Sequence, residues 1–173
     1  MMHVILGLLM LWPQSLYELT KNFESGVSLF YSSSTGSIKR ALDRLLADEY
    51  IHIESEGGPR GKKVYAITGT GRDEFHRWML DDSPGGNLET SLLARSYFLG
   101  LVEPQERAQI AHHIRNHIRR ELTQLEQLEA QAGSRAVPKG LEDVAQYQLA
   151  TLQYGLVTLR AALSWADRHL PHQ

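Results

Sequence analysis

The apolar residues in the first half of the chain recur mainly at helical spacing. Residues 2–11 are apolar almost throughout, which predicts a helix in the middle of a small domain. Further helices are expected over 13–26, which has proline at its start and glycine at its end, over 38–49, and from 68 through 79. The helices over 2–11, 13–26 and 38–49, taken in order, predict a helix-turn-helix.

Two segments after the third helix alternate apolar and polar residues instead. We interpret 50–54 and 64–68 as strands, and the residues that join them, 57–63, are rich in glycine and basic side chains. Helix, strand, basic turn and strand form a winged helix. The helix follows a run of small hydroxyl-bearing residues and can enter a DNA major groove, while the basic turn can lie along the adjacent phosphates. This pattern favours DNA binding.

A break in the apolar pattern divides the chain into two expected domains. Turn-forming residues without apolar periodicity follow the fourth helix, and we place a linker at 83–87. The linker would join a winged-helix DNA-binding domain at 1–82 to a helical dimerisation and effector domain at 88–173. The expected fold class is mainly α, with an N-terminal winged helix-turn-helix (α+β wing) and an all-α C-terminal dimerisation arm.

Everything beyond the linker has helical spacing. Helices are expected over 88–101, 104–131 and 141–169, and the last two are each about 40 Å long at about 1.5 Å rise per residue. Their narrow apolar stripes exceed what so small a domain covers by itself, which favours a coiled-coil-like seam with a second chain. We therefore predict a homodimer. Its interface is expected to contain Ile114, Ile118, Leu125, Leu149, Leu152, Leu156, Leu159 and Leu163.

Composition excludes several classes of protein. The 173 residues contain no cysteine, which rules out disulfide scaffolds, thiol nucleophiles and cysteine-ligated zinc. The apolar start of the chain is too short to span a bilayer and lacks the features of a signal peptide, so we expect a cytoplasmic protein without a membrane partner. No nucleophile elbow, phosphate-binding glycine loop or motif of paired carboxylates occurs. We expect neither enzymatic activity nor a cofactor.

The charge balance does not by itself indicate a nucleic-acid partner. The 18 Lys and Arg residues oppose 20 Asp and Glu, and residues 1–80 contain nine of each kind. The positions of the charged residues matter more than the net charge, because salt screens charges beyond about 10 Å. The predicted DNA-binding residues share one expected face: Ser33, Ser34, Thr35, Ser37, Lys39, Arg40, Arg60, Lys62 and Lys63. The alternative is that the hydroxyl groups only cap the helix, with Ser34 as the cap residue, and that Lys39 and Arg40 lie on an ordinary solvated face.

Three histidines in the 104–131 segment raise the question of a metal site. His113 and His117 are four residues apart, with His112 beside them. The arginines around them repel cations, so we expect no metal and interpret the histidines as a solvated or interface-lining face. Protonation near about pH 6.5 would be a way to tune the dimer.

Several segments together form a recognisable pattern: Ile5 to Leu9, Tyr17 to Leu19, the recognition segment with Ser34, Ile38, Leu42 and Leu45 to Ile51, and the wing and its exit, Gly58 to Thr68 followed by Gly71-Arg72. In these segments the sequence resembles the PadR family of bacterial transcriptional regulators. The helical remainder is similar to the longer, virulence-activator-like subfamily, in which this region forms the dimerisation arm. The sequence departs from the family at Leu16, Lys39 and Tyr50, where glycine, tyrosine and glycine are common. The operator sequence therefore does not follow from the resemblance.

The resemblance also implies control by a small molecule, since some members respond to phenolic acids or drug-like aromatics. Aromatic side chains would stack on such a ligand, and the candidates are Trp12, Tyr97 and Tyr154. The alternative is that these residues belong to the core or to the dimer seam.

Together these features predict a sequence-specific transcriptional regulator that acts as a homodimer on a palindromic operator in double-stranded DNA. Repression, possible to relieve with a small aromatic ligand, is the expected mode, although the sequence does not distinguish repression from activation. The alternative is a protein-interaction module that uses the winged helix and the coiled-coil arm without binding DNA. A MarR-type regulator fits less well, because its dimer helices normally lie at both ends of the chain, whereas here the wing domain begins almost at Met1.

Overall fold

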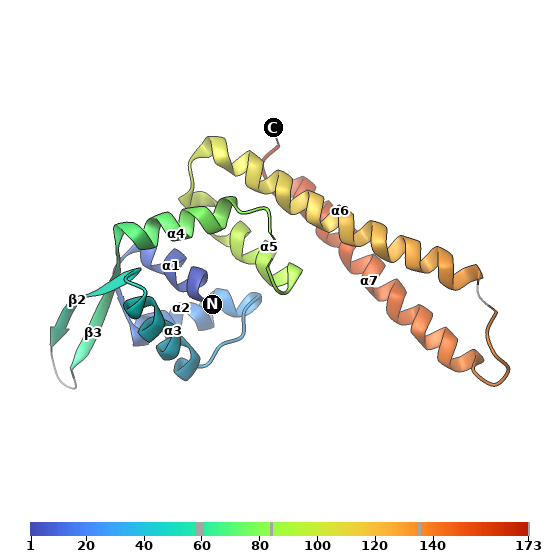
Figure 1. Ribbon diagram of the computed structural model, residues 1–173, viewed down its shortest axis with the longest axis horizontal. Helices are drawn as coiled ribbons and strands as arrows, with labels where there is room; N and C mark the ends of the chain where they lie inside the picture. The colour runs from blue at the N-terminus through green and yellow to red at the C-terminus, as the bar shows by residue number, and fades with distance from the viewer. Residues whose placement is uncertain (58–60, 84, 135, 173) are drawn as a thin grey trace. The chain divides into compact units, whose positions relative to one another are not determined.

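The computed structural model describes residues 1–57, 61–83, 85–134 and 136–172 (Figure 1). The chain forms two compact units, residues 1–107 and residues 108–173. The structure confirms the expected class, a mainly helical chain with a small antiparallel sheet. In chain order the elements are α1 (Met2–Leu11), β1 (Gln14–Ser15), α2 (Leu16–Ser25), η1 (Val27–Leu29), α3 (Thr35–Ala47), β2 (Ile51–Gly57), β3 (Lys62–Ile67), α4 (Gly69–Leu80), α5 (Leu88–Tyr97), η2 (Leu99–Leu101), α6 (Pro104–Ser134) and α7 (Glu142–His169).

Side-chain caps set the starts of the helices in the first unit. Ser34 caps α3 by accepting a hydrogen bond from the Ser37 N–H at 3.2 Å, as predicted. Thr68 caps α4 by accepting from the Gly71 N–H at 3.0 Å. Each cap satisfies one of the helix's otherwise unpaired N–H groups, so the direction of α3 is fixed at its first turn.

The sheet has the order β1-β3-β2, with antiparallel pairing throughout. β2 and β3 form the predicted hairpin, and a bulge interrupts their register between Ile53 and Ser55. β1 was not predicted. In it Gln14 lies opposite Tyr65 and Ser15 lies opposite Val64, so the strand ties the start of α2 to the stem of the hairpin.

The core of the first unit lies between α1, α2, α3 and α4. Fully buried side chains from these helices include Ile5, Leu6, Leu19, Ile38, Leu42, Leu45, Phe75 and Met79. Burying each such side chain stabilises the fold by about 1.5–3 kcal/mol relative to exposure. Gly7 permits a close approach, because a Cβ atom there would lie 2.8 Å from the ring of Phe98.

The two compact units do not divide at the linker expected over 83–87. α5 packs within the first unit, where Phe98 at its end covers Gly7. Arg95 on α5 is 5% exposed and donates hydrogen bonds to the carbonyl oxygens of Trp78 and Ser83 and to the Ser91 hydroxyl. These contacts hold the segment after α4 against α5. The end of the DNA-binding domain at residue 82 stays a prediction.

Within the second unit, α7 runs antiparallel to α6 and packs along it (Figure 1). A Cβ atom added at Gly155 on α7 would lie 2.9 Å from Cδ1 of Leu125 on α6, so the two helices approach closely at this glycine. Arg115, 6% exposed, donates to Asp167 and to the carbonyl oxygens of Ala166, Leu170 and Pro171. Arg115 therefore binds carbonyl groups in the last turn of α7 and just beyond its end, and so ties that end to α6.

This packing corrects part of the predicted dimer seam. Ile114, Ile118 and Leu156 are buried within the single chain, so they are not available as surface contacts for a second chain. The apolar stripe reflects in part the packing of α6 on α7. Leu149 is exposed, while Leu125, Leu152, Leu159 and Leu163 are partly exposed. For these five residues a role in dimerisation stays a prediction.

Candidate nucleic-acid interface

The N-terminal cap and the first two turns of α3 carry most of the predicted DNA-binding side chains. Thr35, Lys39 and Arg40 are exposed. Ser34 and Ser37 are engaged with one another, because their hydroxyl oxygens lie 3.0 Å apart and Arg40 donates to the Ser37 hydroxyl at 3.2 Å. The arrangement presents one basic edge on α3, with the serines as its support.

Ser33 lies differently from the other candidates. Its Oγ atom is buried and has no hydrogen-bond partner among the residues that the structure describes. A hydroxyl turned inward in this way does not face a DNA phosphate. The interface is therefore better described without Ser33 than with it.

The wing supplies the second part of the predicted interface. Lys62 Nζ lies 3.4 Å from Glu18 Oε1, and Lys63 Nζ lies 3.7 Å from Glu56 Oε1. Both lysines remain well exposed, and exposed ion pairs of this kind contribute only about 0–1 kcal/mol. A phosphate group can therefore replace the carboxylate at little cost. Arg60, the third basic candidate of the wing, lies outside the described residues.

Glu18 links α2 to the wing and was missed by the sequence interpretation. It forms a capping box with Ser15, since its carboxylate accepts hydrogen bonds from the Ser15 N–H and hydroxyl while the Ser15 hydroxyl accepts from the Glu18 N–H. These hydrogen bonds, with a smaller contribution from Lys62, hold the pKa of Glu18 below its ordinary value. The carboxylate is therefore charged at neutral pH where it meets Lys62. The sequence signal for this capping box was a serine followed three residues later by a glutamate.

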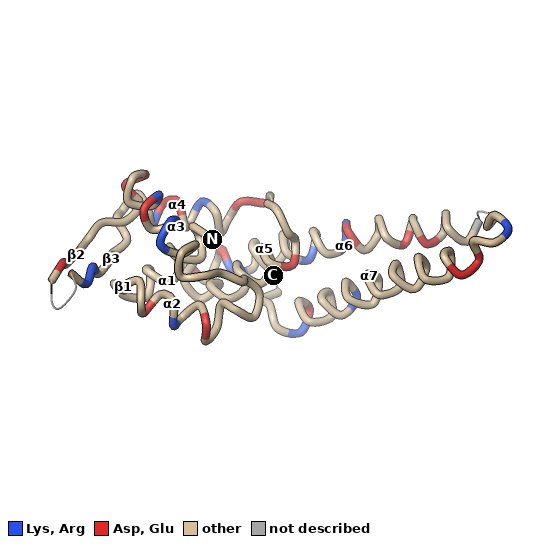
Figure 2. Tube along the Cα trace, turned by 90° about the horizontal axis from the view of Figure 1, so that it is seen from below, with Lys and Arg blue, Asp and Glu red and all other residues tan. Residues whose placement is uncertain are grey.

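The charges around this interface are mixed. Lys and Arg positions occur on α2, on α3 and at the start of β3, with Asp and Glu positions among them (Figure 2). Arg44 is paired with Asp48 on α3, and Lys21 is paired with Glu24 on α2. The part of this surface where basic side chains are not paired with carboxylates is therefore small. Such a surface fits a binder with modest affinity for non-specific DNA.

Two of the candidate effector residues, Trp12 and Tyr97, lie in the first unit, and the third, Tyr154, lies in the second. Tyr97 contacts the rings of Phe30 and Phe98 and stays half exposed. Trp12, which follows α1, and Tyr154, on α7 in the second unit, are both exposed. Their role in ligand binding stays a prediction.

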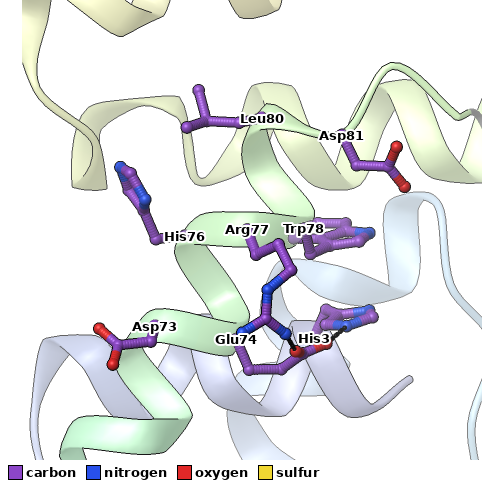
Figure 3. Close-up of a pocket in the computed structure, with 8 residues that line it drawn as sticks. All are labelled: His3, Asp73, Glu74, His76, Arg77, Trp78, Leu80 and Asp81. Carbon is purple, nitrogen blue, oxygen red and sulfur yellow. Dashed lines mark hydrogen bonds and ion pairs between the residues drawn. The ribbon is translucent and has the colours of Figure 1, made fainter.

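A cavity of about 700 Å³ lies beside α4 in the first unit (Figure 3). His3 stacks on Trp78 there with ring centroids 4.9 Å apart, and its Nε2 atom lies 3.0 Å from Glu74. Burial lowers the pKa of His3 below its ordinary value, although Glu74 opposes the shift. Burial therefore favours the neutral form of His3. An adjoining cavity of about 540 Å³ is lined by Tyr31, Trp78 and Arg95 among others.

The histidines of α6 show no metal-binding arrangement. His112 is hydrogen-bonded to Asn116, and His117 is hydrogen-bonded to Arg120. Across the described ranges there is no group of three or more His, Cys, Asp or Glu side chains that could hold a metal ion. In those same ranges no helix has both the length and the hydropathy to cross a membrane.

Comparison with protein families identifies both parts of the chain. Residues 5–77, which extend from α1 into α4, match the model of the transcriptional regulator PadR-like family. Residues 90–171 match the model called virulence activator alpha C-term. The chain therefore combines a PadR-like domain with a virulence activator alpha C-term domain. PadR-like proteins are transcriptional regulators rather than enzymes.

Individual members of the family are similar over part of the chain. The negative transcriptional regulator PadR of Bacillus subtilis is 27% identical over 107 residues, which cover 60% of this chain and 59% of that protein. A probable transcriptional regulator of Mycobacterium tuberculosis, Rv1176c, is 31% identical over 81 residues, which cover 46% of this chain and 43% of that protein. The chain thus aligns with less than two thirds of either relative.

Among solved structures, the crystal structure of B. subtilis PadR in complex with operator DNA matches 96% of this chain and 94% of its own, with 22% identity and a TM-score of 0.46.

Proposed function

We propose that this PadR-like chain is a homodimeric repressor that binds a palindromic operator in double-stranded DNA and is released by a small aromatic ligand. The observation that carries the proposal is the exposed surface of the first two turns of α3. Its exposed Thr35, Lys39 and Arg40 lie on a helix whose start is fixed by the Ser34 cap. A helix with such an N-terminal turn suits the major groove, where side chains reach base edges.

The wing lysines have the complementary role in this proposal. Lys62 and Lys63 lie at the start of β3, next to the turn of the hairpin. Their ammonium groups would leave Glu18 and Glu56 and bind phosphates beside the groove that α3 enters. Contacts of this kind set the position of the protein on the duplex and do not read sequence.

A homodimer would align two such units with the two halves of a palindrome. The support lies on α7, where Val144, Tyr147, Tyr154 and Val157 are large apolar or aromatic side chains that the single chain leaves exposed. An exposed apolar stripe of this extent is typical of an interface. Two recognition helices about 34 Å apart would then match half-sites one turn of DNA apart.

Repression and ligand release are supported by different features. A relative, B. subtilis PadR, is named a negative transcriptional regulator. The cavity of about 540 Å³ beside Tyr31, Trp78 and Arg95 has the volume of an ordinary small-molecule site and offers aromatic and cationic contacts. A ligand held there would lie against the segment that Arg95 fixes between α4 and α5.

The test is binding of the purified chain to the DNA upstream of its own gene at two salt concentrations. If each half-site neutralises about three to five phosphates, a dimer should show a log–log slope of roughly −5 to −9. The variant Lys62→Ala/Lys63→Ala should bind more weakly and show a shallower slope, because it lacks two cations in each chain. The control is Lys139→Ala/Arg168→Ala, which removes the same charge from exposed positions in the second unit.

A salt-independent affinity would contradict the proposal and favour the protein-interaction alternative. Release by a ligand is tested separately, by titrating small aromatic compounds into the complex. Equal DNA affinity with and without every compound would leave the regulator without aromatic control.

A further inference from the structure

His3 on α1 packs its imidazole against α4, beside the cavity of about 700 Å³ and the adjoining cavity of about 540 Å³. The ring is stacked on Trp78 at an interplanar angle of 5°, and its Nε2 atom lies 3.0 Å from Glu74 (Figure 3). The side chain of His3 is 32% exposed, so a proton can reach the imidazole in the folded protein.

Trp78 also contacts a buried cation from α5. The guanidinium carbon of Arg95 lies 5.1 Å from the centroid of the Trp78 indole ring, within the range of a favourable contact between a cation and an aromatic ring. Arg95 donates hydrogen bonds to the carbonyl oxygens of Trp78 and Ser83, so it holds the segment that follows α4. The helices α1, α4 and α5 therefore meet at the indole ring of Trp78.

Groups of both charge signs surround the imidazole of His3. Those that act on it or line the same cavities are the Met1 amino group at the start of α1, Asp73, Glu74, His76, Arg77 and Asp81 on α4 or at its end, and Arg95 on α5. Glu74 attracts a protonated imidazole, but the same carboxylate is also paired with Arg77. Arg95 and the Met1 amino group repel it. Charge alone therefore does not decide whether the folded protein favours the proton.

Burial of the imidazole decides this balance. A protonated ring that packs on Trp78 gives up water that it has in the unfolded chain, and this loss lowers the pKa of His3 more than Glu74 raises it. In the unfolded chain the ordinary histidine pKa of about 6.5 applies. The unfolded state therefore binds more protons just below that pH, and the free energy of unfolding falls as the pH falls through this range.

We propose that protonation of His3 in mildly acidic solution loosens the packing of α1 against α4 and α5. The protonated imidazole would move from Trp78 into solvent, and the indole ring would lose the cover that it has from α1. The segment between Trp78 and Arg95 would then open more readily. This pH response goes beyond the proposed function and does not depend on it, since none of the residues involved belongs to α3 or the wing.

The test compares the unmutated protein with His3→Gln by chemical denaturation at about pH 7.5 and at about pH 5.5. Glutamine keeps a planar group that can donate to Glu74 but does not titrate in this range. We expect the free energy of unfolding to fall further on acidification in the unmutated protein than in His3→Gln. The control is His52→Gln, which removes an exposed imidazole from β2 and should respond to pH as the unmutated protein does.

Two measurements on the unmutated protein do not depend on the stability of the variant. An NMR titration should show the ring signal of His3 changing at a pH below about 6.5. Hydrogen exchange of residues 78–83 and 88–95, corrected for the intrinsic effect of pH on exchange, should be faster at about pH 5.5 than at about pH 7.5.

Three results would overturn the proposal. The first is a loss of stability on acidification that is equal in the unmutated protein and in His3→Gln, because another group would then be the one that titrates. The second is a His3 signal that changes above about pH 6.5, since the folded protein would then favour the proton. The third is unchanged hydrogen exchange while His3 takes up its proton. None of these measurements contains DNA, so the absence of operator binding would count against the proposed function alone.

Discussion

Glu18 takes part in two interactions with different consequences. Its hydrogen bonds with Ser15 stabilise the start of α2, and its ion pair with Lys62 occupies a cation that the proposed interface requires. In the proposed interface, DNA would have to displace this carboxylate before a phosphate could bind Lys62. At the scale of the residue, a contact within the protein would then limit the affinity for DNA.

Glu18→Gln should raise the affinity for DNA. Glutamine retains an oxygen that accepts from the Ser15 N–H but carries no charge to hold Lys62 or to repel phosphate. We expect a two- to fivefold gain on operator and random DNA alike, the scale of one exposed ion pair, measured by fluorescence anisotropy at low salt. The melting temperature should change little, since the cap remains. Glu126→Gln, which breaks an exposed pair with Arg160 in the second unit, is the control. Unchanged or weaker binding by Glu18→Gln would show that the pair positions Lys62 instead of occupying it.

At the scale of the element, the helices were predicted because their signals are local. Ser34 and Thr68 could be recognised as caps from the residues that follow them. β1 could not be predicted, since a strand of two residues has no periodicity and exists only through its pairing with β3. The contacts of Arg95 likewise join residues that only the fold brings together. In the predicted interface, the exposure of Thr35, Lys39 and Arg40 could be foreseen, whereas the inward turn of Ser33 could not.

The junction between β2, β3 and α4 leaves no room at Gly71. A Cβ atom there would lie 2.0 Å from the carbonyl oxygen of Tyr50, which accepts the Thr68 N–H. Gly71→Ala should therefore lower the free energy of unfolding by about 2 kcal/mol or more, because backbone has to move. Chemical denaturation monitored by circular dichroism measures this change in the free energy of unfolding. Gly69→Ala is the matched control in the same helical turn, where nothing lies within 4 Å of the added atom. Equal loss in both variants would contradict the role of the close approach, because alanine favours a helix over glycine and Gly69→Ala by itself should not destabilise the fold.

At the scale of the whole molecule, the long apolar stripes had two possible partners. Periodicity shows that one side of a helix is covered, but not whether the cover comes from the same chain or from another. The antiparallel packing of α6 and α7 accounts for the buried Ile118 and Leu156. It does not account for Tyr147 and Tyr154, which lie seven residues apart on α7 and are 71% and 74% exposed. Residues two helical turns apart share a face, so this side of α7 remains uncovered in the single chain.

Tyr147→Glu/Tyr154→Glu should convert a dimer into a monomer. Two charges on the uncovered face of α7 would have to be buried against a second chain, which is costly without partners. Sedimentation velocity at the same protein concentration should show half the mass, while the thermal unfolding of the separated chain should be little changed, since both side chains are exposed in it. Operator binding should weaken far more than random-DNA binding, because two linked half-sites gain from effective concentration and a single one does not. The control, Gln146→Glu/Gln148→Glu, adds the same charge at exposed positions beside this face. A variant that remains dimeric would place the seam elsewhere, and the partly exposed Leu152, Leu159 and Leu163 would be the next positions to test.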